Sequence, residues 1–295
     1  MHRSLTTGPD RRPAEGDVAR TFDQLGYRIS VAGGTRIGHR YPANFDVLHV
    51  DRATPFLAVA DGLGGGEGSA LAGSTAMTTF VAAVRALGAT VGPDQLRSAV
   101  AAAQSQVNAA GAQLGELTGC TLTALVTGPA GPAGWSPGSP TWNAPTALWT
   151  PSVIAGPPRP RPGWIVQIGD SRAYRLRDRR LELLTVDHTE AWLGTLHGWY
   201  PAGSPAANAA RYRLTRYVGH PDSPEPDLLN VSLLPGDVYC LCTDGVTDEI
   251  GYALLASRLG SDADPIKIVH GLLADTLAAG GRDNATLAVL RVETR

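Results

Sequence analysis

The sequence predicts one α+β domain, in which short β-strands gather at both ends of the chain and helices occur in consecutive pairs. Two long segments, 69–87 and 94–114, consist mostly of Ala, Leu, Val, Gln and Thr and indicate the first pair of helices. Several short apolar runs stop at an Asp-Gly or Gly-Asp pair, which is typical of a strand that ends in a turn. Strands and paired helices in this order predict a β-sandwich between helices.

The other elements follow from apolar runs between turn residues. Strands are expected at 27–32, 45–50, 56–60, 121–127, 164–168, 173–176, 227–233, 238–243 and 285–292. A second pair of helices is expected at 248–259 and 265–279. The carboxylates at the strand ends are therefore candidates for a shared site.

Two segments are expected to differ from this regular framework. Residues 1–22 mix Arg, Pro, Gly and Asp without an apolar stretch, which predicts a disordered tail and not a secretory signal. Residues 23–295 are then one catalytic domain. Within it, residues 128–163 contain ten prolines and predict an irregular insert. Its Trp135, Trp142 and Trp149 either dock a partner or fold back over the domain's own surface.

Composition argues against several classes of function. The 295 residues carry 25 basic and 27 acidic side chains, so a formal charge of −2 favours neither nucleic acid nor an anionic membrane as a partner. No apolar run reaches the roughly 18 residues that a membrane span requires. Cys120, Cys240 and Cys242 lack metal-ligand spacing and lie in apolar runs, which predicts reduced core residues and a cytoplasmic protein.

Four aspartates share one sequence context. Each lies at the end of an expected strand beside Gly or Asn, and they are Asp61, Asp170, Asp244 and Asp283. Any one such motif alone is more typical of a turn. Together, carboxylates in one cleft are the ligands that Mg²⁺ and Mn²⁺ prefer. Two such ions about 3.5 to 4 Å apart would activate water for attack on a phosphate ester, so the pattern indicates a phosphomonoesterase.

Seven segments, in this order along the chain, are similar to motifs of the type 2C (PPM) protein phosphatase family. They are 59–65 (VADGLGG), 119–122 (GCTL), 168–174 (IGDSRAY), 184–189 (LTVDHT), 234–237 (LPGD), 241–248 (LCTDGVTD) and 280–286 (GGRDNAT). The resemblance runs from about residue 27 to residue 292. It implies a four-layer α/β/β/α sandwich, with a central antiparallel β-sandwich between helix pairs and a site at one end.

The resemblance also implies roles for single residues. Asp61 would bridge two Mn²⁺ or Mg²⁺ ions, and the carbonyl of Gly62 would join the second ion. Asp244 and Asp283 would complete the first ion's ligands, so that they and Asp61 form the catalytic set. Asp170 would serve a third, weaker metal site. Asn284 would support the site from behind by orienting Asp283 or a bound water.

The first motif of the family reads Arg-x-x-Asn-Glu-Asp, in which the Arg contacts phosphate and the acidic pair supports the second metal. In this chain Asn44 and Asp46 match as a supporting residue and a metal-site residue, whereas Phe45 replaces the acidic residue between them. Arg40 lies one position further from Asp46 than in the family, and Arg36 is a second candidate for binding phosphate.

Two further positions bear on proton transfer. Leu63 occupies the place where some family members carry a histidine proposed as the general acid, so the leaving group would take its proton from water or another group. His188 precedes an expected helix and is interpreted as a structural hydrogen-bonding residue.

These observations lead to three functional hypotheses. The first is metal-dependent hydrolysis of phosphoserine and phosphothreonine in proteins, with a serine/threonine kinase as the counterpart. The second, favoured by Phe45 and the displaced Arg40, is a catalytically weak or inactive family member that binds phosphoproteins or another partner. The third is an enzyme on the same scaffold that acts on small phosphate esters.

Overall fold

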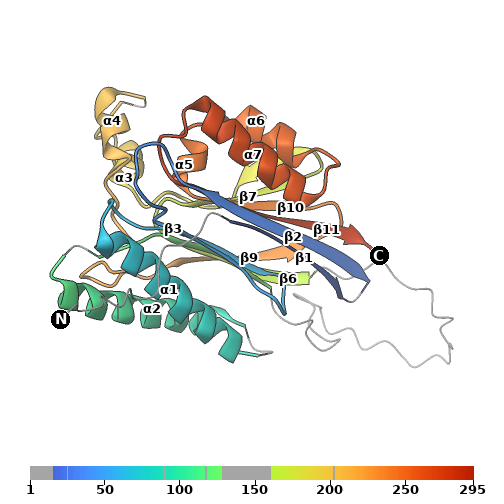
Figure 1. The fold of residues 1–295 in the computed structure, drawn as a ribbon, viewed down its shortest axis with the longest axis horizontal. Helices are drawn as coiled ribbons and strands as arrows, with labels where there is room; N and C mark the ends of the chain where they lie inside the picture. Colours follow the sequence, from blue (N-terminus) through green and yellow to red (C-terminus); the bar gives the residue numbers. More distant parts are fainter. Residues whose placement is uncertain (1–15, 25, 89–90, 117, 128–160, 202) are drawn as a thin grey trace, which may run out of the picture.

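Two antiparallel sheets packed face to face form the centre of the molecule (Figure 1). The structure, a computed structural model, describes residues 16–295 except 25, 89–90, 117, 128–160 and 202. The first sheet has the order β1-β2-β11-β10-β7-β8 and consists of β1 (Gly16–Gln24), β2 (Tyr27–Arg36), β11 (Ala285–Thr294), β10 (Val238–Cys242), β7 (Arg172–Arg177) and β8 (Arg180–Leu183). The second has the order β3-β4-β5-β6-β9 and consists of β3 (Asp46–Val50), β4 (Phe56–Asp61), β5 (Leu122–Thr127), β6 (Arg161–Ile168) and β9 (Asp227–Leu233).

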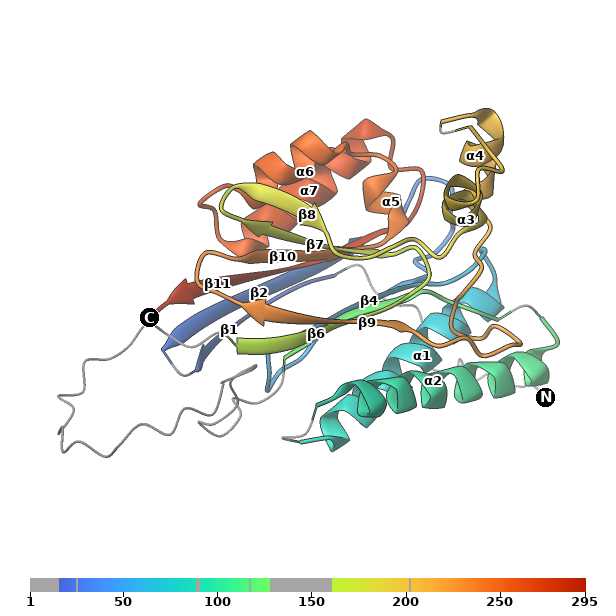
Figure 2. The same ribbon diagram turned by 180° about the vertical axis from the view of Figure 1, so that it is seen from behind.

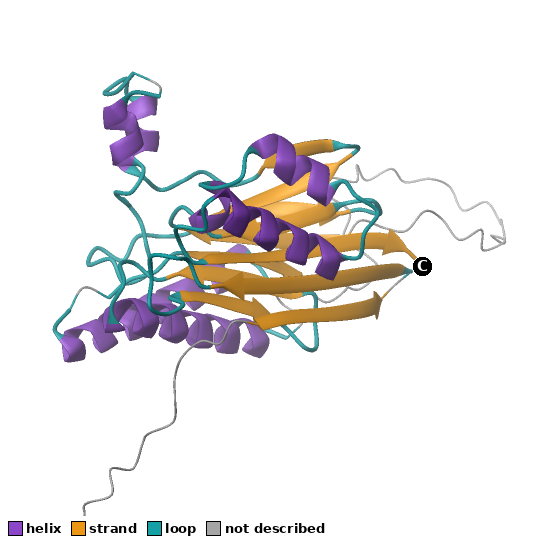
Figure 3. Cartoon of the chain, turned by 45° about the horizontal axis from the view of Figure 1, so that its top comes forward, coloured by secondary structure: helices purple, strands orange, loops and turns teal. Residues whose placement is uncertain are grey.

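Paired helices cover the outer face of each sheet. α1 (Glu67–Ala86) and α2 (Pro93–Leu114) lie on the second sheet, and α6 (Tyr252–Leu259) and α7 (Pro265–Ala279) lie on the first (Figures 1 and 2). Figure 3 shows the same arrangement from another side, with helices over the outer faces of the strands. The layers confirm the predicted α/β/β/α sandwich. No helix within the described ranges has both the length and the apolar character that crossing a membrane requires.

Alternation along the strands builds two kinds of core. In β4, Ala58 and Ala60 pack toward α1 and α2, whereas Leu57 and Val59 pack between the two sheets. In β10, Leu241 likewise faces the space between the sheets. Since side chains of a strand alternate with a period of two, the next inward-facing positions are Asp61 and Thr243. The inner core therefore ends in polar residues at this edge.

A layer of polar side chains closes this end of the sandwich. The hydroxyls of Thr35 on β2 and Thr286 on β11 are 2.6 Å apart, and the Asn44 amide donates to the Thr35 hydroxyl at 2.7 Å. The Thr243 hydroxyl donates to Asp46 Oδ2 at 2.9 Å, which joins the first sheet to the second. Buried polar groups are tolerated when they are hydrogen-bonded, so this layer links the sheets where apolar packing stops.

Two short helices lie at the same end of the molecule, in the connection between β8 and β9. They are α3 (Glu190–Leu196) and α4 (Pro205–Ala210), and both extend beyond the sheets (Figures 1 and 2). Each begins at a hydroxyl residue that accepts a hydrogen bond from the first turn: Thr189 from the Trp192 amide and Ser204 from the Ala207 amide. One more turn of helix, α5 (Asp244–Thr247), follows β10 directly.

Most expected elements occur within a few residues of their predicted positions, with the following corrections. Residues 16–22, assigned to the tail, belong to strand β1, which pairs with β2 over its whole length. Residues 161–163, assigned to the insert, begin β6. Strand β8 and helices α3 and α4 were not predicted. Residues 1–15 and the three insert tryptophans lie outside the described residues, so the predictions for them stay predictions.

The three cysteines are buried and form no disulfide, as the sequence predicts. Cys240 and Cys242 lie on the face of β10 that packs toward α6 and α7, and Cys120 lies in the core beneath α1 and α2. They are core residues and take no part in the site described next.

Candidate metal centre

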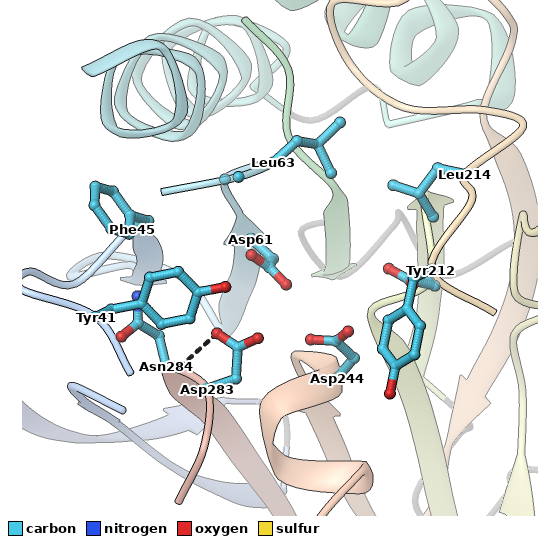
Figure 4. Close-up of a pocket in the computed structure, with 12 residues that line it drawn as sticks. Tyr41, Phe45, Asp61, Leu63, Tyr212, Leu214, Asp244, Asp283 and Asn284 are labelled. Atoms are coloured by element: carbon cyan, nitrogen blue, oxygen red, sulfur yellow. Dashed lines mark hydrogen bonds between the residues drawn. The ribbon is translucent and has the colours of Figure 1, made fainter. Parts of the chain in front are cut away.

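The four predicted aspartates meet at one pocket at the polar end of the sandwich. The pocket has a volume of about 120 Å³ and is lined by Tyr41, Phe45, Asp61, Gly62, Leu63, Gly64, Asp170, Tyr212, Leu214, Asp244, Asp283 and Asn284. In Figure 4 the carboxylates of Asp61, Asp244 and Asp283 point toward one another, while aromatic and aliphatic side chains surround them. The convergence expected from the strand-end pattern is therefore present.

Asp61 is held by the backbone at the end of β4. Its amide donates to the Thr121 hydroxyl at 2.9 Å, and its carbonyl accepts from the Thr121 amide at 2.8 Å. The next residue must be glycine, because a Cβ on Gly62 would lie 2.6 Å from the Ser69 carbonyl oxygen and 2.9 Å from that of Phe45. The Asp-Gly pair thus brings α1 and the start of β3 close to the carboxylate.

Asp244 and Asp283 come from two neighbouring segments of the first sheet. Asp244 is the first residue of α5, and Asp283 precedes β11, where its Oδ1 accepts from the Asn284 amide at 2.7 Å. A side chain on Gly245 would collide with the Asn284 carbonyl oxygen. The second Asp-Gly pair therefore lets the two segments pack closely enough to place both carboxylates in one pocket.

Asp170 enters the pocket from the turn between β6 and β7, which belong to different sheets. Gly169 has a φ of +109°, and a Cβ there would lie 2.6 Å from Thr121 Cβ, so the turn requires glycine. His188 fixes the same turn, since its Nδ1 accepts from the Gly169 amide at 3.1 Å and its Nε2 lies 3.0 Å from Asp227 Oδ2. His188 is structural, as the sequence analysis interprets it.

Asp46 lies behind Asp61 and does not line the pocket. The two residues are opposite each other in the β3–β4 pair, but the Asp46 side chain is only 1% exposed. Burial raises the pKa of Asp46 to about 8, although the hydroxyls of Thr286 and Thr243 partly oppose the shift. The predicted place of Asp46 at the metal site stays a prediction: in this structure its side chain lies in the polar layer behind Asp61.

The electrostatics of the pocket favour a cation. Burial is the largest cause that raises the pKa values of Asp61, Asp170 and Asp283, and it raises the pKa of Asp244 to about 6. Repulsion between carboxylates adds to the effect, since Asp46 and Asp244 both raise the pKa of Asp61. Removal from water and like charges both disfavour the ionised form, and a bound cation reverses both effects.

Two buried oxygens have no hydrogen-bond donor, namely Oδ1 of Asp46 and Oδ1 of Asp244. A buried carboxylate oxygen without a partner is costly, and a hard divalent cation is the ligand that such oxygens accept best. Within the described ranges, no three His, Cys, Asp or Glu side chains are already arranged around one point as a metal site. By its chemistry the donor set nevertheless fits a divalent cation, because four aspartates line the same pocket.

The two candidate phosphate ligands differ in position. Arg36 faces the outside of the first sheet, where its guanidinium pairs with Asp17 of β1 at 2.8 and 3.0 Å. Thr35, the preceding residue, faces the polar layer, so alternation directs Arg36 away from the pocket and its assignment is corrected. Arg40 is exposed, and its charge partly opposes the rise in the pKa of Asp283 that burial causes.

Arg40 also lines a second pocket of about 350 Å³ beside the first. The two pockets share Tyr41, Tyr212, Asp244 and Asp283. Of the two arginines, only Arg40 is therefore in a position to meet an anion that enters toward the carboxylates.

The two predicted supporting asparagines act on the backbone. Asn284 Oδ1 accepts from the Gly38 amide at 3.0 Å, and its Nδ2 donates to the Ala43 carbonyl at 3.2 Å. Asn44 Oδ1 accepts from the Asp46 amide at 3.1 Å. The side chain of Asn284 therefore holds the loop that carries Arg40, while its backbone amide donates to Asp283 Oδ1.

The remaining walls are largely apolar or aromatic. Phe45 is 7% exposed and packs edge to face on Tyr41, with ring centroids 5.8 Å apart. On the opposite side stand Leu214 and Tyr212, and the Tyr212 hydroxyl donates to Asp248 Oδ2 at 3.3 Å. The sequence does not predict Tyr41, Tyr212 or Leu214 as site residues, because Tyr41 stands at a position that the first motif leaves open and the other two lie outside every motif.

Comparisons with curated proteins find bacterial phosphatases, whereas a scan against protein-family models finds no match. The serine/threonine protein phosphatase PstP of Mycobacterium tuberculosis is 32% identical over 129 residues, which cover 43% of this chain and 24% of PstP. A putative protein phosphatase 2C-type of Streptococcus pyogenes is 30% identical over 127 residues, which cover 43% of this chain and 52% of that protein. The chain thus spans about half or less of the length of these curated relatives.

Solved structures match over most of the fold. The PPM Ser-Thr phosphatase MsPP of Mycobacterium smegmatis, in complex with cacodylate, has a TM-score of 0.67 and 28% identity, over 88% of this chain and 97% of its own. PstP/Ppp of Mycobacterium tuberculosis has a TM-score of 0.68 and 27% identity, over 90% of this chain and 99% of its own. The catalytic domain of PstP in complex with two manganese ions has a TM-score of 0.66 and 26% identity, over 90% and 99%.

Proposed function

We propose that this chain is a bacterial PPM (type 2C) serine/threonine phosphatase and that it hydrolyses phosphoserine and phosphothreonine in proteins, in keeping with the relatives and solved structures that it resembles. The observation that carries the proposal is the convergence of Asp61, Asp244 and Asp283 in one pocket, with Arg40 lining the pocket beside it. Carboxylates and a guanidinium at such a site are complementary to a metal ion and a phosphate group, respectively.

The proposed metal is Mn²⁺ or Mg²⁺, with one ion held by Asp61, Asp244 and Asp283. The Gly62 carbonyl and Asp61 are the expected protein ligands of a second ion. One relative was solved with two manganese ions, which supports this choice. When bound, such an ion lowers the pKa of a water molecule and neutralises charge on the phosphoryl oxygens. Asp170, which shares the pocket, is the proposed ligand of an additional, weaker site.

The residues of the chain would divide the remaining tasks. Arg40 would bind the phosphate at the mouth of the pocket and orient it for attack. Leu63 and Leu214 would exclude bulk water from the carboxylates. Among the described residues, no histidine lines either pocket, so the leaving alkoxide would take its proton from solvent water.

The proposal includes a phosphorylated protein as substrate, and a serine/threonine kinase must act before this enzyme, because phosphoserine forms only by phosphoryl transfer. Three unpaired buried cysteines support a cytoplasmic location. The hypothesis of an inactive, partner-binding family member has no support in the comparisons, since the curated relatives are named as phosphatases.

The test is the initial rate of hydrolysis of phosphoserine and phosphothreonine peptides, and of p-nitrophenyl phosphate, with Mn²⁺, with Mg²⁺ and with a chelator. The variant Asp244→Asn removes one carboxylate from the pocket, whereas Asp222→Asn removes one whose side chain is 90% exposed. We expect metal-dependent turnover that Asp244→Asn abolishes and Asp222→Asn retains.

Turnover that persists in chelator, or that Asp244→Asn retains, would refute the metal-dependent mechanism. Hydrolysis of the small ester without any hydrolysis of phosphopeptides would favour an enzyme that acts on small phosphate esters.

A further inference from the structure

The carboxylates of the pocket are distributed unevenly around Asp61. Asp244 and Asp283 lie together on one flank of it, and their carboxylates face that of Asp61 (Figure 4). Asp170 belongs to the Asp244 side, because it shares a smaller neighbouring pocket with Asp244 and with the ion pair of Arg172 and Asp187. This arrangement collects negative charge on one flank only.

The other flank of Asp61 is formed by Phe45, Leu63 and the glycine backbone around Gly62 and Gly64. The Phe45 ring is buried and lies 4.0 Å from the position that a Cβ on Gly65 would take. Tyr41 closes this flank and offers a neutral phenol. None of the residues that line this flank carries a carboxylate.

Asp46 does not supply the carboxylate that the flank of Phe45 lacks. Its side chain is 1% exposed, lies outside the pocket lining and accepts a hydrogen bond from Thr243 Oγ1 at 2.9 Å. Its Oδ1 has no hydrogen-bond partner, but the described residues that line the pocket do not include Asp46. A second cation next to the first would therefore find only the shared carboxylate of Asp61 and neutral oxygens.

We infer that this chain binds one divalent cation tightly, on the flank shared by Asp61, Asp244 and Asp283, and does not retain a second on the flank of Phe45. The inference rests on the proposed function, and it separates this chain from the relative solved with two manganese ions. The affinity of an oxygen site for a divalent ion rises with the number of charged ligands. Repulsion from the first ion, at a spacing of about 4 Å, further weakens the second site.

The first experiment counts bound ions without any substrate. Mn²⁺ is titrated into the metal-free full chain, with heat measured by calorimetry and free Mn²⁺ measured by its six-line EPR signal. We expect one equivalent to bind before free Mn²⁺ accumulates, and any second equivalent to bind at least about tenfold more weakly. Two equivalents of similar affinity, or a spin-coupled Mn²⁺ pair in the EPR spectrum, would overturn the inference.

Substitutions at Phe45 then test whether the apolar side chain at this position is the reason that a second ion is not retained. Phe45→Glu places a carboxylate on the empty flank and is expected to gain a second equivalent and a spin-coupled signal, whereas Phe45→Leu keeps the flank apolar and is expected to bind one. Thermal melting establishes that each variant is folded. A folded Phe45→Glu that still binds one ion would refute the assignment of this flank. If that variant does not fold, the count for the natural chain decides.

Hydrolysis measured on the same samples separates this inference from the proposed function. Two tightly bound ions together with phosphopeptide turnover would refute the single-ion inference alone. One bound ion without turnover on any phosphate ester would refute the proposed activity alone.

Discussion

The hydroxyl of Thr243 is expected to be a main link between the two sheets at the site end. Thr243 is fully buried, donates to Asp46 Oδ2 at 2.9 Å and accepts from the Thr286 amide at 3.1 Å. The change Thr243→Val keeps the shape of the side chain and removes both hydrogen bonds. It leaves a buried amide without an acceptor and a buried carboxyl with one donor fewer.

Each buried polar group that loses its partner costs about 1 to 3 kcal/mol, so Thr243→Val, which affects two such groups, is expected to lower the free energy of unfolding by about 2 to 6 kcal/mol. The matched control, Thr243→Ser, keeps the hydroxyl and loses one methyl group, which costs about 1 kcal/mol. Both values are measured by urea unfolding in chelator at pH 7, followed by circular dichroism. A Val variant as stable as the Ser variant would show that the hydroxyl does not join the sheets.

Two further predictions concern charge at the site. Arg40→Ala is expected to raise KM for a phosphopeptide about tenfold, because the variant loses a charge-assisted hydrogen bond to phosphate. The control Arg36→Ala is expected to leave KM unchanged. Equal effects of the two variants on KM in a peptide-hydrolysis assay would contradict the assignment of Arg40 as the phosphate ligand. In metal-free protein, stability is expected to fall between pH 4 and pH 8, because the folded-state pKa values of Asp46 (about 8) and Asp244 (about 6) lie above the ordinary aspartate pKa of 3.8. The folded state therefore binds more protons than the unfolded state in that window, and urea midpoints in chelator that rise with pH would refute this.

The positions of the site carboxylates could be predicted because short sequence patterns mark them. Asp61 and Asp244 each precede a glycine at the end of an apolar run, and both glycines prove to be required by close backbone contacts. The order of these motifs along the chain is the order found in one phosphatase family, which related them to each other. The strands and long helices were predictable for a similar reason, since each has an apolar face that is buried.

Other features depend on contacts that no local pattern records. Strand β1 was missed because it lies at the edge of its sheet and most of its described side chains are exposed, so it has almost no apolar alternation. Arg36 was a plausible phosphate ligand until the register of β2 set the direction of its side chain. Tyr212 reaches the pocket from an irregular segment after α4, and only the tertiary structure places it beside Asp244.

The pocket draws its acidic residues from both sheets, and this has a consequence for synthesis of the protein on the ribosome. Asp61 belongs to the second sheet, whereas Asp244 and Asp283 extend from the first and are translated about 180 to 220 residues later. A nascent or truncated chain that lacks the later segment has only part of the ligand set. The proposed ligand set is therefore complete only after β11 has paired with β2 and β10, and a chain that ends before β11 lacks Asp283 or its support.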